Sequence, residues 1–145
     1  MYRFNLESLL QYRIFIEKKL QREFIILKQE LYDEKEKLNA CINEREKNMI
    51  EFDQKQKEGV SVSTSLLYKN FFYRLAKELK EQEFQIDKVG KRVDEKNSDL
   101  IEAIKKRKML DKLKEKGLRS YMNKLANKEQ KFIDEVAINN YIRNM

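Results

Sequence analysis

The fold of this chain is decided where its apolar periodicity stops, at Lys57-Glu58-Gly59-Val60-Ser61-Val62-Ser63-Thr64-Ser65. On both sides of this stretch, apolar residues return every three and then four positions, which is the heptad signature of a coiled coil. Gly59 is able to end a helix in a left-handed conformation, and the serines and the threonine that follow are able to cap the next helix. The stretch therefore predicts a turn between two helices.

The two apolar strips share one register about this turn. A turn centred near residue 60 pairs positions whose numbers sum to about 120, so that Leu20 faces Leu100 and Leu31 faces Val89. This agreement favours an all-α fold, a long antiparallel two-helix coiled-coil hairpin, over a parallel dimer of an unbent chain. The strips are Leu6, Leu10, Leu20, Phe24, Leu27, Leu31, Leu38, Cys41 and Phe52, then Tyr68, Phe72, Leu75, Leu79, Ile86, Val89, Val93, Leu100, Ala103 and Leu110.

We expect residues 1–145 to form a single coiled-coil domain. Helix one is predicted at about 3–57, the turn at about 58–64 and helix two at about 65–141, with a break near 117 left open. Charged residues make up 39% of the chain and proline is absent, which suits long solvated helices with a thin core. The register leaves residues after about 115 without a partner, so their apolar face needs another protein or must fold back at Gly117.

The composition argues against chemistry within the chain. Histidine is absent, which removes the usual general base and the commonest metal ligand, and the three glycines are too far apart for a phosphate loop. Cys41 is the only cysteine, so we expect a core thiol and no disulfide. We therefore expect no catalysis, no cofactor and no metal site. No apolar run approaches the roughly 20 residues that span a bilayer, and the start lacks a signal-peptide core, so we expect a cytoplasmic location.

The net charge of +7 is distributed unevenly. Residues 1–28 carry six bases and three acids, and residues 100–131 carry eleven bases and four acids. These stretches lie side by side in the predicted hairpin, so the end that bears the termini is basic and suits an acidic docking site. The run Lys105–Lys108 encircles its helix and has acidic neighbours, so we expect no binding to nucleic acid.

The middle of the predicted hairpin has a poor seam beside a dense aromatic run. Arg45 and Asn48 on helix one face Leu75 and Phe72 on helix two, and Glu34 faces Ile86. The aromatic residues are Tyr68, Phe71, Phe72 and Tyr73. Since neighbours on a helix are separated by about 100° of rotation, one seam hides only one or two of these rings. The others either form a binding patch or are covered by long polar side chains.

Both ends of the chain resemble one family, the flagellar export protein FliJ. The opening reads Tyr2-Arg3-Phe4-Asn5-Leu6-Glu7-Ser8-Leu9-Leu10-Gln11-Tyr12-Arg13, followed by Glu17. The closing segment, Lys128-Glu129-Gln130-Lys131-Phe132-Ile133-Asp134-Glu135-Val136-Ala137, is similar to that family's last segment, in which an Asp-Glu pair precedes small and apolar residues. Tyr68-Lys69-Asn70-Phe71 and Leu75 resemble the start of its second helix. The stalk component of virulence-type secretion systems has a similar shape.

The resemblance implies a non-enzymatic, stalk-like component of the bacterial flagellar type III export apparatus, cytoplasmic and peripherally associated with the inner membrane. Its implied partners are the hexameric export ATPase, whose activity it promotes, and the cytoplasmic domain of the export gate FlhA, together with export chaperones. The alternatives are a coiled-coil adaptor or chaperone escort without ATPase coupling, the equivalent virulence-type stalk, and a nucleic-acid-binding coil.

Two sets of residues are predicted to contact these partners. For the ATPase end we choose residues near both termini: Phe4, Leu6, Leu9, Leu10, Arg13, Asp134 and Glu135. For the gate we choose Phe71, Phe72 and Leu75.

Overall fold

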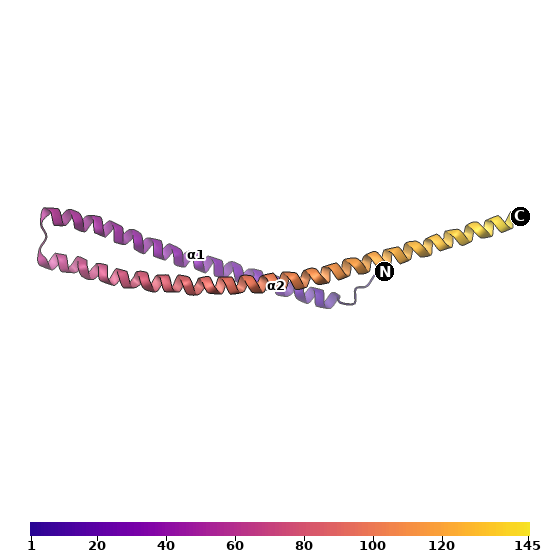
Figure 1. The fold of residues 1–145 in the computed structure, drawn as a ribbon, viewed down its shortest axis with the longest axis horizontal. Helices are drawn as coiled ribbons and strands as arrows, with labels where there is room; N and C mark the ends of the chain where they lie inside the picture. Colours follow the sequence, from indigo (N-terminus) through magenta and orange to yellow (C-terminus); the bar gives the residue numbers. More distant parts are fainter. The chain divides into compact units, whose positions relative to one another are not determined.

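A computed structural model describes all residues, 1–145, and contains two helices and no strand (Figure 1). Helix α1 spans Glu7–Glu58 and helix α2 spans Val62–Arg143, and three residues join them. The all-α prediction is confirmed, as is the hairpin of two helices that pack against each other. Helix α1 begins about four residues later than predicted, and α2 passes through Gly117 without a break.

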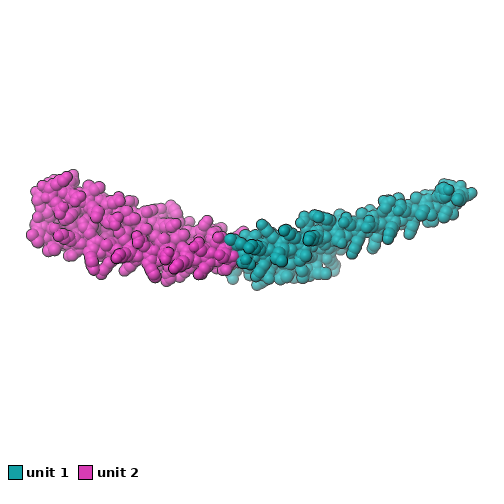
Figure 2. All heavy atoms as spheres, viewed as in Figure 1, with its two compact units in different colours: residues 1–19, 101–145 teal, residues 20–100 magenta.

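The chain divides into two compact units (Figure 2). Unit 1 contains Met1–Lys19 and Ile101–Met145, and unit 2 contains Leu20–Leu100 with the turn between the helices. Each unit is described separately below, and the single coiled-coil domain stays a prediction.

The turn in unit 2 is shorter than predicted because Ser61, the earliest of the candidate caps, is the one used. Gly59 has a φ of 98°, which is the left-handed conformation that ends α1, and its amide donates to the carbonyl of Gln56 at 3.3 Å. The Ser61 hydroxyl then accepts a hydrogen bond from the Thr64 amide at 3.2 Å. Helix α2 therefore starts at Val62, about three residues before the predicted start.

The seam of unit 2, the line of side chains through which α1 and α2 pack, follows the predicted antiparallel register. The ring centroids of Phe52 and Tyr68 lie 4.8 Å apart, and Phe52 also contacts Phe72 at 6.1 Å. Burial follows the heptad on α2, where every third or fourth residue is withdrawn from solvent. The buried apolar residues of this unit are Leu75, Leu79, Val89, Val93 and Leu100.

Polar pairs cross the seam of unit 2 at three of its levels, one of them near the turn, where Lys55 donates to the Tyr68 hydroxyl at 2.9 Å. Lys96 donates to Glu23 at 2.7 Å, and the Gln82 amide donates both to the Glu34 carbonyl at 2.8 Å and to the Glu34 carboxylate. We expected Glu34 to weaken the seam because it faces Ile86. This expectation is wrong, since Gln82, one turn before Ile86, donates to the Glu34 carboxylate. Such pairs fix the register, since a shifted pairing would leave polar groups in the seam without partners.

The other expected weak point of the seam is present. Asn48 donates to the carbonyl of Glu44 in its own helix at 2.7 Å, and the Nε atom of Arg45 is buried without a hydrogen-bond partner. Neither residue makes a polar bond to α2. The seam near the aromatic run is therefore held by ring packing and by Lys55 of α1, whose ammonium donates to the Tyr68 hydroxyl of α2 at 2.9 Å.

The helices of unit 1 combine a short apolar seam with a charged cluster. Leu10 on α1 and Ala103 and Leu110 on α2 are buried. Glu17, also buried, accepts a hydrogen bond from Arg107, which donates in addition to Asp111 at 2.6 Å. These two carboxylates raise the pKa of the Arg107 guanidinium. Nearer the N-terminus, the Lys114 ammonium lies 2.9 Å from the Glu7 carboxylate.

Substituting the two glycines of unit 2 should have opposite effects on stability. Gly59→Ala places a side chain at positive φ and should lower the free energy of unfolding by about 1–2 kcal/mol. Gly90→Ala adds a methyl group inside α2 with no atom within 4 Å, and should raise it by about 1 kcal/mol. Urea denaturation measures both, and effects of the same sign would contradict this description of the turn.

The Glu34 carboxylate should make the free energy of unfolding depend on pH. The hydrogen bond from Gln82 lowers the pKa of Glu34, so the folded chain binds this proton less tightly than the unfolded chain. Its contribution is complete above the unfolded pKa of about 4.3 and is lost as the pH falls through the folded pKa. Unfolding free energies at pH 6 and pH 3 should therefore differ less in Glu34→Gln than in the wild type. An exposed carboxylate, Glu36→Gln, is the control, and equal pH dependence of wild type and Glu34→Gln would contradict the prediction.

Candidate functional site: partner-binding surfaces of the two units

The N-terminal segment of unit 1 packs across Gly117 of α2. The Tyr2 hydroxyl donates to the Lys114 carbonyl at 3.4 Å, and its ring lies 5.8 Å from that of Tyr121. A Cβ atom on residue 117 would overlap the Tyr2 hydroxyl oxygen. Gly117 therefore makes room for Tyr2, and α2 has a partner as far as Tyr121, not only to about residue 115 as expected.

The predicted ATPase-end residues near the N-terminus differ in accessibility. Leu6 and Leu9 are 41% and 39% exposed, whereas Leu10 is buried in the seam. Phe4 is half-buried ahead of α1, and the half-buried Arg13 places its guanidinium 5.8 Å from the centre of the Tyr12 ring. Leu6, Leu9 and part of Phe4 are thus available to a partner, while Leu10 holds α1 against α2.

Asp134 and Glu135 lie elsewhere in unit 1. Both are exposed on α2, as is every residue from Met122 to Met145, and Asp134 accepts a hydrogen bond from Gln130 at 3.1 Å. Asp134 follows Tyr121 by thirteen residues, or about 20 Å of helix. The structure therefore does not bring the Asp-Glu pair together with the N-terminal residues.

Beyond Tyr121, where α2 is exposed, the helix face that continues the seam is basic and the neighbouring face is apolar. The heptad of the seam runs through Lys114, Gly117 and Tyr121, and its next positions are the lysines 124, 128 and 131. The apolar stripe of this segment begins one residue later in the heptad, about 100° further around the helix. Its exposed members are Leu118, Met122, Leu125, Phe132 and Val136. A partner of this segment thus meets an apolar stripe with a basic flank.

The two units also differ in net charge. Unit 1 contains 16 lysines and arginines against 8 aspartates and glutamates, whereas unit 2 contains 16 against 17. Most of the basic end expected from the sequence, residues 1–28 and 100–131, therefore falls within unit 1. An acidic partner surface would be attracted to unit 1 and not to unit 2.

The predicted gate residues occupy three different environments in unit 2. Phe72 packs in the seam against Phe52, and Leu75 is only 3% exposed, so neither presents a full face to a partner. Phe71 is half-buried against Phe72, at 5.7 Å between ring centroids, with the Arg74 guanidinium 5.7 Å from its centre. Of the three, Phe71 is the accessible one.

Phe71 borders a shallow groove in unit 2. The groove has a volume of about 260 Å³, and its other lining residues are Asn48, Glu51, Leu67 and Tyr68. Leu67, which sequence reasoning missed, is 69% exposed and lies one turn before Phe71 on α2. Tyr73, also exposed, lies on another face and is covered in part by Lys77, whose Nζ atom is 4.9 Å from its ring centre.

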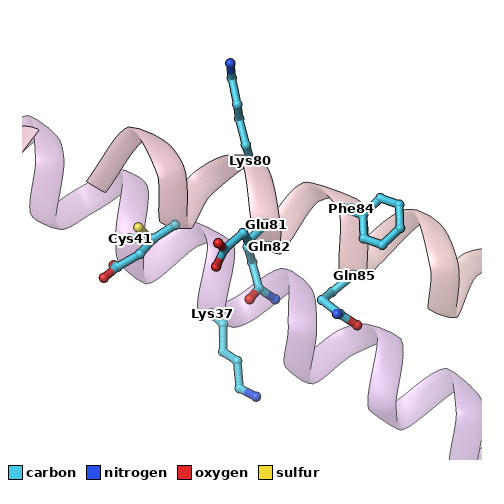
Figure 3. A pocket seen from close by; sticks show the side chains of 8 residues that line it. Lys37, Cys41, Lys80, Glu81, Gln82, Phe84 and Gln85 are labelled. Atoms are coloured by element: carbon cyan, nitrogen blue, oxygen red, sulfur yellow. The ribbon is translucent and has the colours of Figure 1, made fainter. Parts of the chain in front are cut away.

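A second and larger groove of unit 2, about 640 Å³, contains Cys41 (Figure 3). Lys37 and Cys41 of α1 line it, with Phe84 and several polar residues of α2. Burial raises the pKa of the Cys41 thiol, and the negative charges of Glu78 and Glu44 raise it further. The structure holds no group of three or more cysteines, aspartates or glutamates placed to bind a metal ion.

The sequence model of one known family, described as Flagellar FliJ protein, matches residues 2–145 of this chain. The chain belongs to the flagellar FliJ family. It is therefore a component of the flagellar protein export apparatus. No curated protein and no solved structure matched the chain. Neither helix of this FliJ-family chain is both long and apolar enough to cross a membrane.

Several contacts of this FliJ-family chain escaped sequence reasoning although the sequence held a signal for them. The pairs Glu7–Lys114, Glu17–Arg107 and Glu23–Lys96 all sum to about 120, and each places an acid on α1 opposite a base on α2. The apolar strips alone do not include these positions. The Tyr2 contact with Gly117 had no such signal, because Tyr2 precedes the helix.

The contact of Tyr2 with Gly117 is testable in this FliJ-family chain by a double-mutant cycle. Gly117→Ala should gain about 1 kcal/mol of helix propensity, but the methyl group displaces the Tyr2 ring and part of the gain is lost. In a Tyr2→Ala background the full gain should appear. Coupling of about 0.5 kcal/mol or more in unfolding free energy supports the contact, and additive effects would show that Tyr2 does not lie over residue 117.

Proposed function

We propose that this protein is a non-enzymatic stalk that links the hexameric export ATPase to the cytoplasmic domain of the export gate FlhA. The observation that carries the proposal is the separation of two accessible surfaces of different chemistry. Unit 1 is basic and has an exposed apolar stripe, while the nearly neutral unit 2 has a shallow groove, lined by apolar and polar side chains, beside Phe71. Two surfaces on separate units suit two simultaneous partners.

The ATPase contact is assigned to unit 1. Leu6, Leu9 and Phe4 offer apolar contacts beside the half-buried Arg13, and the helix from Met122 onward offers a second surface. Asp134 and Glu135 are also assigned to the ATPase contact, on a part of α2 that is separate from the N-terminal residues. Leu10 acts indirectly, because it holds α1 in place. A basic unit would be guided electrostatically into an acidic ring opening, and this attraction would weaken with salt.

The gate contact is assigned to the groove of unit 2 that Phe71 and Leu67 line. Aromatic residues such as Phe71 are enriched at protein interfaces, and the exposed Leu67 beside it adds apolar contact area. Phe72 and Leu75 support Phe71 from the seam. In this proposal the protein is cytoplasmic and reaches the inner membrane only through the gate.

An adaptor or chaperone escort without ATPase coupling is the second candidate. The exposed apolar stripe of α2 favours it, because an amphipathic helix with no partner suits the groove of another protein. The rate of ATP hydrolysis by the purified export ATPase, measured with and without this protein, discriminates between the stalk and the adaptor. Stimulation supports the stalk, and no effect at a saturating concentration of this protein supports the adaptor.

Substitutions in the two units should separate the two activities. Leu67→Ala with Phe71→Ala should weaken binding to the FlhA cytoplasmic domain about tenfold, with ATPase stimulation unchanged. Phe4→Ala with Leu9→Ala should reduce the stimulation and leave gate binding intact. Tyr73→Ala, an exposed aromatic on another face of α2, is the matched control and should alter neither. Loss of both activities in either double variant, with helix content unchanged, would contradict this division.

A further inference from the structure

We propose that the gate segment that docks at Leu67 and Phe71 continues along α2 into the Cys41 groove and carries a lysine or arginine that pairs with Glu78 and Glu81. The inference rests on the proposed gate binding and defines the chemistry of the bound segment. It calls for an apolar side chain at the Phe71 end and a cation at the Cys41 end.

The Cys41 groove exists because the seam is locally underfilled. Cys41 occupies a heptad position where most of α1 carries leucine or phenylalanine, and a thiol fills less volume. On α2, the Gln82 amide at this level is turned toward Glu34, to which it donates. The side chains that would close the space are thus small or directed elsewhere. A volume of about 640 Å³ is left, bordered by the Phe84 side chain, which is itself largely exposed.

Carboxylates remain unneutralised inside this groove, while its lysines point away. In Figure 3, Lys37 and Lys80 extend away from the space between the helices, and Glu81 and Gln82 point into it. Lys37 is engaged with Glu34 at 3.4 Å. Glu78 lies close enough to Cys41 to raise the pKa of the thiol. Neither Glu78 nor Glu81 forms an ion pair in the structure.

The two grooves lie on one face of unit 2. Phe71 and Glu78 are seven residues apart on α2, as are Leu67, Arg74 and Glu81, so they form adjacent rows along the helix. On α1, Glu51 lines the first groove and Glu44, seven residues before it, acts on Cys41 in the second. Seven residues correspond to about 10 Å of helix. A bound segment needs to extend only this far beyond Phe71 to reach Glu78.

The charges select the kind of segment that binds. A purely apolar segment would remove water from Glu78 and Glu81 without replacing their hydrogen bonds, which is unfavourable. A lysine or arginine would supply those bonds and a favourable charge interaction. Nucleic acid is disfavoured, because its phosphates would face the carboxylates of this groove. The geometry therefore fits a basic and apolar polypeptide segment.

Cys41, the single thiol of the chain, makes occupancy of the groove measurable without mutation. Labelling by a bulky maleimide should slow at least tenfold when the FlhA cytoplasmic domain is added at saturation. In Leu67→Ala with Phe71→Ala, which removes the anchor, about tenfold more gate domain should be needed for the same protection. If the gate domain binds by an independent assay but the labelling rate is unchanged, the extension into the groove is wrong while the gate contact stands. If the gate domain does not bind at all, both fail.

A matched pair of charge reversals tests the cation. Glu78→Lys should weaken binding of the FlhA cytoplasmic domain at least tenfold and reduce the dependence of the affinity on salt. Glu83→Lys changes the charge by the same amount on another face of α2 and should alter the affinity less than twofold. Circular dichroism and thermal unfolding confirm that both variants fold. Equal effects of the two reversals would overturn the pairing.

Discussion

The structure depends on the antiparallel register between α1 and α2. Apolar packing alone would tolerate a shift by one heptad, because apolar side chains face one another at many levels. The polar pairs across the seam do not, since a shift would leave Glu17 or Glu34 buried or half-buried without its donor. Removal of the donor would leave a carboxylate that is partly withdrawn from water without a hydrogen-bond partner, which is unfavourable. The turn at Gly59 then joins the two helices in this register.

The narrow seam between the two helices leaves many apolar residues exposed to binding partners. Few side chains can be withdrawn from water, so apolar residues outside the seam remain accessible to partners. The protein presents these surfaces in two ways. In unit 1, α2 continues beyond Tyr121 with a stripe of its own, displaced from the seam by one heptad position. In unit 2, a small residue and a turned amide open a groove along the seam itself.

Sequence reasoning was most successful where periodicity determines the structure. The two strips, their shared sum and the role of Gly59 follow from heptad spacing and from the freedom of glycine at positive φ. It was less successful where one side chain decides among equivalent choices. Four residues were able to cap α2, and only the structure identifies Ser61. Gly117 suggested a break, yet it accommodates Tyr2. Leu75 lies on the predicted strip and is buried, but the sequence did not reveal that Leu67 is exposed beside Phe71 or that a groove lies beside Cys41, because these depend on how the two helices pack.

The register within a single chain is tested most directly by a disulfide between Leu31→Cys and Val89→Cys in a Cys41→Ser background. Mild oxidation of the dilute protein should produce a cross-linked monomer rapidly and in high yield. A second pair, Leu31→Cys with Val93→Cys, shifts one partner by a turn of helix and should react more slowly. Cross-linked dimers as the main product, or equal rates for the two pairs, would contradict an intramolecular antiparallel hairpin in this register.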